Sequence, residues 1–240
     1  QAEGSSIIEL AHHVKEGQVP DDLLAPLADR RFFRCSLEQT VEVVVQTYLN
    51  AIERGYTLHH VQILSPIYKG PAGVHRLNAE IQRRLNPRSE GKKEVQFGDQ
   101  FFRQGDKVLQ LVNHPDHPVY NGDMGTIIAI DEDAQPDEPI CWVQFDRQEV
   151  PYQRSQLSQL QLAYACSIHK AQGSEFPIVI MPVLKNYRRM LRRNLIYTGI
   201  TRSQAYLILC GEESAFVHGV KNGEAEQRNS CLQKLIQAEW

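Results

Sequence analysis

Long apolar runs are missing from this sequence: none approaches the roughly 20 residues that a helix needs to cross a bilayer. Its first residues also lack the charged start and apolar centre of a signal peptide. We therefore expect a cytoplasmic protein with no membrane partner. The sequence begins with Gln1 rather than methionine, which leads us to expect a fragment of a longer protein.

Cysteine is scarce and scattered. The cysteines stand mostly inside apolar runs, and no two form a CxxC pair: they are Cys35, Cys141, Cys166, Cys210 and Cys231. We interpret them as small core residues in a reducing compartment, not as disulfide partners or zinc ligands. His114 and His117 have a spacing that metal ligands can use, but no further cluster supports them, so we expect no metal site.

An excess of basic charge is also absent. Lys and Arg total 26 against 29 Asp and Glu, which gives a net charge of −3. The overall charge therefore does not indicate a nucleic-acid-binding protein, and any phosphate contacts must be local. A phosphate-binding loop of the form GxxxxGK[ST] is missing too. The composition is otherwise that of a globular protein, and 240 residues can hold one large domain or two small ones.

One stretch combines a β-prone start with a polar, glycine-bearing end. Residues 163–175 read AYACSIHKAQGSE and are followed by the apolar run PIVIMPV. Two buried strands joined by a polar segment suit a parallel sheet with a site at its strand ends, where Gly173 would let the backbone approach a ligand. The alternative is a capped helix N-terminus with a solvated lysine.

A second stretch, residues 194–204, reads NLIYTGITRSQ and runs into the strand-like AYLILCG. Together the two stretches resemble the last two motifs of superfamily 1B helicases of the RecD type, SIHKSQGSE[FY] and LLYTA[IV]TRA. Ala171 replaces a serine in the first motif, and Ile196, Gly199 and Ser203 depart from the second. Matches of this length are far more specific than a lone glycine-rich triplet.

The resemblance implies an α/β fold: a RecA-like parallel-sheet helicase lobe of the P-loop NTPase fold, namely the second motor lobe. It implies that Arg202 is an arginine finger for the γ-phosphate of ATP, and that Gln172, Gly173 and Glu175 lie at the nucleotide. It also implies ATP and Mg²⁺ as cofactors, with the Mg²⁺ ligands in a first RecA-like lobe of the same parent chain. The DNA-binding residues that it implies in these motifs are Ser167, His169 and Lys170.

A strand at residues 60–65 leads into the loop SPIYKGPAG. Ser65, Lys69 and the loop glycines could hold a phosphate through backbone N–H groups and the ammonium. The alternative is a turn stiffened by its prolines, with a solvated lysine. The loop resembles the family's LSPxx[KR]GxxG, which lines the single-strand track. Asn78, on the helix expected over residues 74–85, matches the same family pattern, whereas its ordinary role would be surface polarity or a cap.

The sequence pattern changes between residues 94 and 160, where five short β-prone runs alternate with turn signals. This pattern predicts a small SH3-like β-barrel inserted into the α/β domain, which would occupy residues 1–93 and 161–240. The family carries such an insert with the motifs FxxGD[KR]V and [FY]NGDxG, and both are present, at residues 102–108 and 120–125. Asn121 and Gly122 read as a tight turn that needs positive φ.

The resemblance thus predicts the C-terminal portion of an ATP-dependent 5′-to-3′ DNA helicase of the RecD type, with a role in recombination and repair. Its partners would be single-stranded DNA and duplex ends. Two other classes stay open: a stand-alone nucleic-acid-binding or adaptor module without ATPase activity, and a P-loop enzyme whose loop has degenerated. Arg202 within its full motif argues against the first, because a pure binder does not need it.

Overall fold

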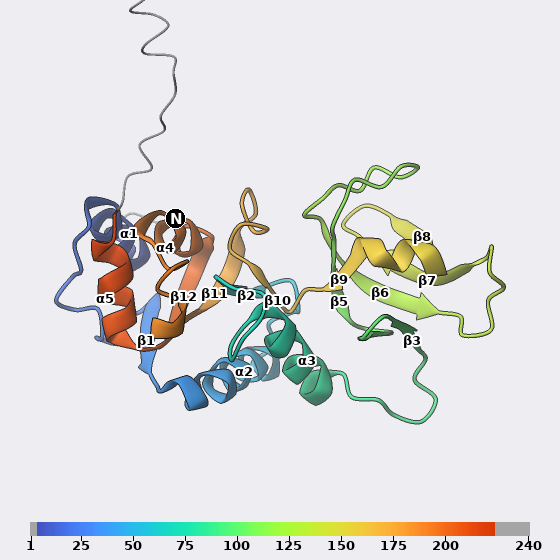
Figure 1. The fold of residues 1–240 in the computed structure, drawn as a ribbon, viewed down its shortest axis with the longest axis horizontal. Coiled ribbons are helices and arrows are strands. Elements are labelled where there is room, and N and C mark those ends of the chain that lie inside the picture. The colour runs from blue at the N-terminus through green and yellow to red at the C-terminus, as the bar shows by residue number, and fades with distance from the viewer. Residues whose placement is uncertain (1–3, 224–240) are drawn as a thin grey trace, which may run out of the picture.

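The computed structural model describes residues 4–223, in which two five-stranded β-sheets lie side by side along the long axis of the molecule (Figure 1). The first sheet is parallel throughout and has the strand order β1-β12-β11-β2-β10. Its strands are β1 (Arg30–Arg34), β2 (Val61–Ser65), β10 (Ala165–Ser167), β11 (Phe176–Val183) and β12 (Ser203–Gly211). Burial on both faces explains why β11 reads as a continuous apolar run. All five residues of β2 are buried as well, including the polar Gln62 and Ser65.

Helices cover both faces of this sheet, as expected for a RecA-like lobe. On one face α2 (Leu37–Glu53) and α3 (Val74–Leu85) pack against each other and against β2, β10, β11 and β12. The other face carries α1 (Ser6–Glu16), α4 (Arg193–Ile200) and α5 (Glu213–Lys221). A short 3₁₀ turn, η2 (Lys185–Tyr187), follows β11 in this lobe. A second one, η1 (Arg154–Gln159), lies in the other sheet, between residues 153 and 160. Among residues 4–223 no helix is both long and apolar enough to cross a membrane.

Local signals account for the helix ends. Ser5 caps α1 by accepting a hydrogen bond from the Ile7 N–H at 3.3 Å, and Gly17 ends the helix with φ of 78°. Helix α2 begins after Ser36, whose N–H donates a hydrogen bond to the Gln39 side chain at 3.1 Å. The predicted helix over 74–85 is α3, with the same bounds.

The second sheet forms from the insert between α3 and β10. Its five strands are antiparallel in the order β8-β7-β6-β5-β9, and a separate hairpin precedes them. The hairpin is β3 (Glu94–Phe97) with β4 (Gln100–Arg103); the sheet is β5 (Lys107–Gln110), β6 (Met124–Ile130), β7 (Pro139–Gln144), β8 (Glu149–Gln153) and β9 (Leu160–Leu162). We call residues 94–162 the insert. Each of the five predicted β-prone runs supplies one of its sheet strands.

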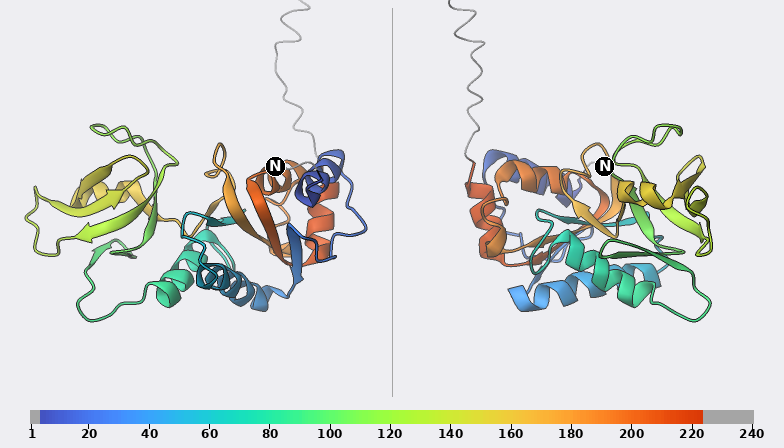
Figure 2. Two further views of the ribbon diagram at one scale, coloured as in Figure 1. Left: turned by 180° about the vertical axis from the view of Figure 1, so that it is seen from behind. Right: turned by 45° about the vertical axis from the view of Figure 1, so that its right-hand side comes forward.

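The insert stands beside the lobe rather than on top of it, and Figure 2 shows this from two further directions. Within residues 4–223 no strand pairing joins β8 to β9, so the sheet has two edges where a closed barrel would have none. The expected lobe ends at residues 1 and 240 lie outside the described residues.

Candidate functional site

Two loops leave the same edge of the parallel sheet. β2 and β10 are neighbours, with Ser65 paired in register with Ser167, so their carboxyl ends meet. Loop 66–73 follows β2, and loop 168–175 follows β10. Ser65, Lys69 and His169 therefore belong to the ends of adjacent strands, the usual place for a ligand site in a parallel sheet.

Loop 66–73 is a tightly built turn with Lys69 exposed on it. Ser65 is fully buried, and its hydroxyl donates to the Ala72 carbonyl at 3.0 Å, which ties the two ends of the loop together. A side chain at Gly73 would place its Cβ 2.7 Å from the Tyr68 carbonyl oxygen, so glycine is required there. Ser65 therefore shapes the loop from below, and Lys69 is the group that a ligand can reach.

Ser167 has a similar supporting position. It is 3% exposed, and its hydroxyl lies 3.1 Å from the Tyr68 hydroxyl, so it links the two loops. His169 is exposed beside it. Lys170 is half-buried and donates through Nζ to Asn121 Oδ1 of the insert at 2.7 Å. Tyr68 stands in the loop that was expected to hold a phosphate, whereas Asn121 was expected only to form a turn, although it stands in a motif that carried the resemblance.

Asn78 does not lie at this surface. It is 3% exposed, and its amide nitrogen donates to the Leu162 and Ala165 carbonyls at 2.8 and 2.9 Å. Its amide oxygen accepts from the Ala165 N–H at 2.8 Å. Because the hydrogen-bonding capacity of the amide is used inside the protein, this geometry does not fit the expected contact with DNA.

Loop 168–175 crosses from the carboxyl edge of the sheet to the amino ends of β11 and β12, where Arg202 lies. The Arg202 carbonyl accepts from the Phe176 N–H at 2.9 Å. The guanidinium donates through Nη1 to the Ser174 carbonyl at 3.1 Å and through Nε to the Thr198 carbonyl at 3.2 Å. The sequence suggested a single strand-end site, whereas the structure places its two halves at opposite edges, joined by this loop.

The expected nucleotide residues gather at the Arg202 end. Glu175 accepts from the Gln204 amide at 3.2 Å, and Gln172 and Gly173 are exposed in the loop just before it. Gly173 has φ of 88°, a left-handed conformation that side-chain-bearing residues rarely adopt. Exposed N–H groups of such a loop can face an anionic ligand, and the fixed charge of Arg202 lies beside them.

Metal chemistry finds no support in this part of the chain. Residues 4–223 contain no group of three or more His, Cys, Asp or Glu arranged to hold an ion. Burial raises the pKa of Cys166 to about 12, which keeps this thiol next to Ser167 protonated and unreactive. The resemblance places the Mg²⁺ ligands in a first RecA-like lobe, so the residues described here do not test that prediction.

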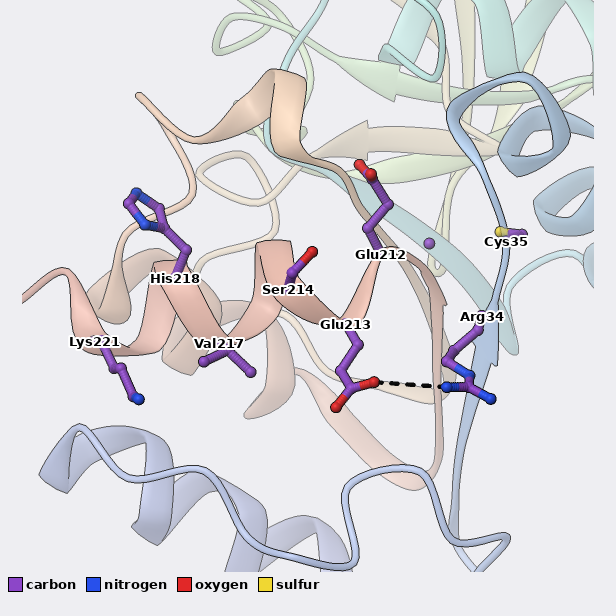
Figure 3. Close-up of a pocket in the computed structure, with 9 residues that line it drawn as sticks. Arg34, Cys35, Glu212, Glu213, Ser214, Val217, His218 and Lys221 are labelled. Carbon is purple, nitrogen blue, oxygen red and sulfur yellow. Dashed lines mark ion pairs between the residues drawn. The ribbon is translucent and has the colours of Figure 1, made fainter.

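A hollow of about 920 Å³ lies elsewhere, at the carboxyl ends of β1 and β12 and the first turns of α5 (Figure 3). Arg34 and Glu213 face each other in it at 3.8 Å. None of the residues expected to bind DNA or nucleotide lines this hollow. The volume of this hollow is therefore no reason to place the DNA or nucleotide site there.

Comparison with known proteins matches both parts of the chain. Residues 77–145 match the family model of the ATP-dependent RecD-like DNA helicase SH3 domain, and residues 162–210 match that of the UvrD-like helicase C-terminal domain. The ATP-dependent RecD2 DNA helicase of Deinococcus radiodurans is 34% identical over 178 residues, which cover 74% of this chain and 24% of that protein. The RecBCD enzyme subunit RecD of Haemophilus influenzae is 27% identical, over 80% of this chain and 27% of that protein.

The chain thus spans about a quarter of the length of these curated relatives. Among solved structures, a Bacteroides Pif1 helicase in complex with ADP-AlF3 and single-stranded DNA aligns with a TM-score of 0.54 at 17% identity, over 99% of this chain and 55% of that one. Bacteroides Pif1 bound to single-stranded DNA aligns with a TM-score of 0.53 at 17% identity, over 87% of this chain and 49% of that one. At such identities the likeness concerns the fold. The two family models and these relatives agree: the chain is similar to the RecD-like helicases, with a match to their SH3 domain followed by a match to the UvrD-like helicase C-terminal domain.

Proposed function

We propose that this chain is the second motor lobe of an ATP-dependent DNA helicase that moves 5′ to 3′ and acts in recombination and repair. A first RecA-like lobe of the same parent protein would supply the phosphate loop and the Mg²⁺ ligands. The observation that carries the proposal is the loop 168–175. It starts next to the loop that carries the exposed Lys69, contains the exposed His169 and ends against the guanidinium of Arg202.

Arg202 suits the arginine-finger role because a guanidinium stays charged and presents a rigid fork of donors. In the present structure the fork is held by the Ser174 and Thr198 carbonyls. When the first lobe brings ATP to this edge, the guanidinium would exchange these neutral acceptors for γ-phosphate oxygens, which are stronger partners. Gly173 would offer its N–H to the same phosphate, Gln172 would lie beside it, and Glu175 would accept from the ribose hydroxyls.

The DNA track would run along the carboxyl edge of β2 and β10. Lys69, His169 and Lys170 would contact phosphate and sugar, and Ser65 and Ser167 would hold the two loops in place from below. Such contacts are independent of sequence and sensitive to salt. ATP-driven closure would move the start of loop 168–175 along the strand because its end is attached to the nucleotide site.

The test compares this 240-residue chain with the full-length protein. We expect the chain to bind single-stranded DNA without hydrolysing ATP, because half of the nucleotide site is missing. The full-length protein should hydrolyse ATP in a DNA-stimulated manner and unwind duplexes that carry a 5′ overhang in preference to a 3′ overhang. DNA-stimulated turnover by the 240 residues alone would refute the half-site proposal. DNA binding by a full-length protein without ATPase activity would favour the adaptor module.

A further inference from the structure

The two motifs of the insert, GDK at residues 105–107 and NGD at residues 121–123, both contact the motor lobe. Asp106 is fully buried and accepts hydrogen bonds from Gln82 and Asn86 of the α3 region, each at 2.6 Å, and from the Tyr164 hydroxyl at 2.8 Å. These three partners lie outside the insert. The carboxylate of Asp106 therefore binds the base of the insert to the helical face of the lobe.

The next residue reaches a different part of the lobe. Lys107 is fully buried, and its ammonium donates to the Leu58 and Val61 carbonyls at 2.8 and 3.2 Å and to the Gln62 side chain at 2.8 Å. Three acceptors match the three N–H donors of an ammonium. The same ammonium lies 5.6 Å from the centre of the Phe176 ring, at the amino end of β11 where Arg202 is held.

These two adjacent buried residues thus fix the base of the insert in two directions. Removing one member of such a buried, fully bonded set leaves partners without hydrogen bonds and is strongly destabilising. A further contact joins His59 of the lobe to Thr126 of β6, with 2.9 Å between Nε2 and Oγ1. Three residues at the base of the insert, Asp106, Lys107 and Thr126, are therefore hydrogen-bonded to the lobe.

The other motif forms the tip of the insert, a turn over residues 120–123. The Asp123 N–H donates to the Tyr120 carbonyl at 3.0 Å, and Gly122 has φ of 106°. The tight turn with a positive φ that the sequence predicts is thus present, and because Gly122 alone supplies the positive φ it is a type II arrangement with glycine at its third position. The Asn121 N–H is held by the Asn113 side chain at 3.0 Å, which directs the turn toward Lys170.

The contact of the tip with Lys170 has a particular chemistry. Asn121 Oδ1 accepts one N–H of the ammonium at 2.7 Å. A neutral amide restrains the long side chain without neutralising its charge, so the other donors of Lys170 stay available for a phosphate. Restraint in advance lowers the rotamer entropy that binding would otherwise cost. Lys170 and Ser174, which accepts from Arg202, stand in the same short loop.

We propose that the insert is a rigid brace for loop 168–175, and that Asn121 is a positioning residue which holds Lys170 and thereby couples DNA binding to the placement of Arg202. This inference rests on the proposed helicase function. The base of the insert at Asp106 and Lys107 would keep the turn at residues 120–123 fixed relative to the lobe. That turn holds Lys170 at the start of loop 168–175, and Ser174 near the end of the same loop accepts from Arg202.

The test uses Asn121→Ala and Asn121→Asp, with Arg147→Ala as the control. Arg147 lies on an exposed turn of the same insert, with its side chain 94% exposed. In the full-length protein, we expect Asn121→Ala to raise the DNA concentration for half-maximal ATPase stimulation about threefold to tenfold, the range for loss of one exposed hydrogen bond. Asn121→Asp, which neutralises Lys170, should weaken the stimulation further. Arg147→Ala should change neither the DNA concentration for half-maximal stimulation nor the extent of the stimulation.

Two additional measurements separate this inference from the proposed function. In a double-mutant cycle, Asn121→Ala should have no further effect once Lys170 is alanine. In the 240-residue chain without ATP, hydrogen exchange over residues 168–175 should rise in Asn121→Ala and stay unchanged in Arg147→Ala. Unchanged exchange, or additive effects of the two alanines, would overturn the brace. Absence of DNA-stimulated hydrolysis in the wild-type full-length protein would instead overturn the proposed function, whatever the exchange result.

Discussion

The side chain of Asn78 and the backbone of Ala165 form two hydrogen bonds in opposite directions, 2.9 Å from Nδ2 to the carbonyl oxygen and 2.8 Å from the N–H to Oδ1. Strand β10 pairs with β2 on one side and ends the sheet on the other. Asn78 therefore takes the place of a neighbouring strand at that free edge. It holds the strand from which loop 168–175 departs.

We expect Asn78→Ala to lower the free energy of unfolding of the 240-residue chain by about 1–3 kcal/mol, because it leaves buried backbone groups of Ala165 and Leu162 without partners. Asn78→Asp should do no better, since a carboxylate would face two carbonyl oxygens. Urea denaturation measures the effect, and Asn50→Ala on the exposed side of α2 is the matched control. A variant with wild-type stability but weakened DNA binding would instead indicate that Asn78 contacts DNA, as the resemblance implies.

The stability of the chain should depend on pH through Lys107. Burial lowers the pKa of this amine from 10.5 to about 7. Between these values the unfolded chain holds a proton that the folded chain has released, so stability rises with pH, by at most about 1.4 kcal/mol per pH unit for one proton. Below pH 7 both states are protonated and this contribution is constant.

Urea midpoints of wild type and Lys107→Met from pH 6 to pH 10 measure this dependence. The difference between the two proteins isolates Lys107, because the other titrating groups are common to both. We expect the wild type to gain stability relative to the variant as the pH rises above 7. Parallel curves would mean that the three acceptors around the ammonium keep it charged throughout.

Sequence reasoning predicted most of the elements because their signals are local. The bounds of α3 and the five β-prone runs of the insert depend on neighbouring residues. The roles of single polar residues were less predictable. Asn78 and Ser65 match the pattern of a DNA track, yet both are buried, because partners distant in sequence decide whether an amide or a hydroxyl faces solvent. The Lys170–Asn121 contact joins two units and has no local signal at all.

The contribution of Lys69 to DNA binding can be measured directly. In the full-length protein, Lys69→Ala should weaken the binding of single strands of every sequence and lower the salt slope by about 0.7, the share of one phosphate on a single strand. Lys15→Ala removes an equal charge from α1, which lies on the face of the sheet opposite α2 and α3, and it serves as the control. If affinity and salt slope both stay at the wild-type value, loop 66–73 is only a turn stiffened by its prolines.

Arg202 should be essential for hydrolysis and dispensable for binding. In the full-length protein, Arg202→Ala should reduce the rate of ATP hydrolysis by about 10³–10⁵, as loss of an arginine finger does, while ATP and DNA affinities stay largely intact. Arg202→Lys should recover little, because an ammonium keeps the charge but lacks the planar fork.

The same substitution also removes structural hydrogen bonds, so its two effects must be separated. Loss of the contacts with Ser174 and Thr198 should cost about 0.5–1.5 kcal/mol each, which urea denaturation of the 240-residue chain measures without any ATPase. Thr198→Ala keeps both backbone carbonyls and the arginine, and it controls for disturbance of α4. A rate loss in Arg202→Ala that vanishes under conditions where the variant is fully folded would assign Arg202 a structural role alone. A deficit that persists in the folded variant, with nucleotide still bound, would place its guanidinium in the transition state.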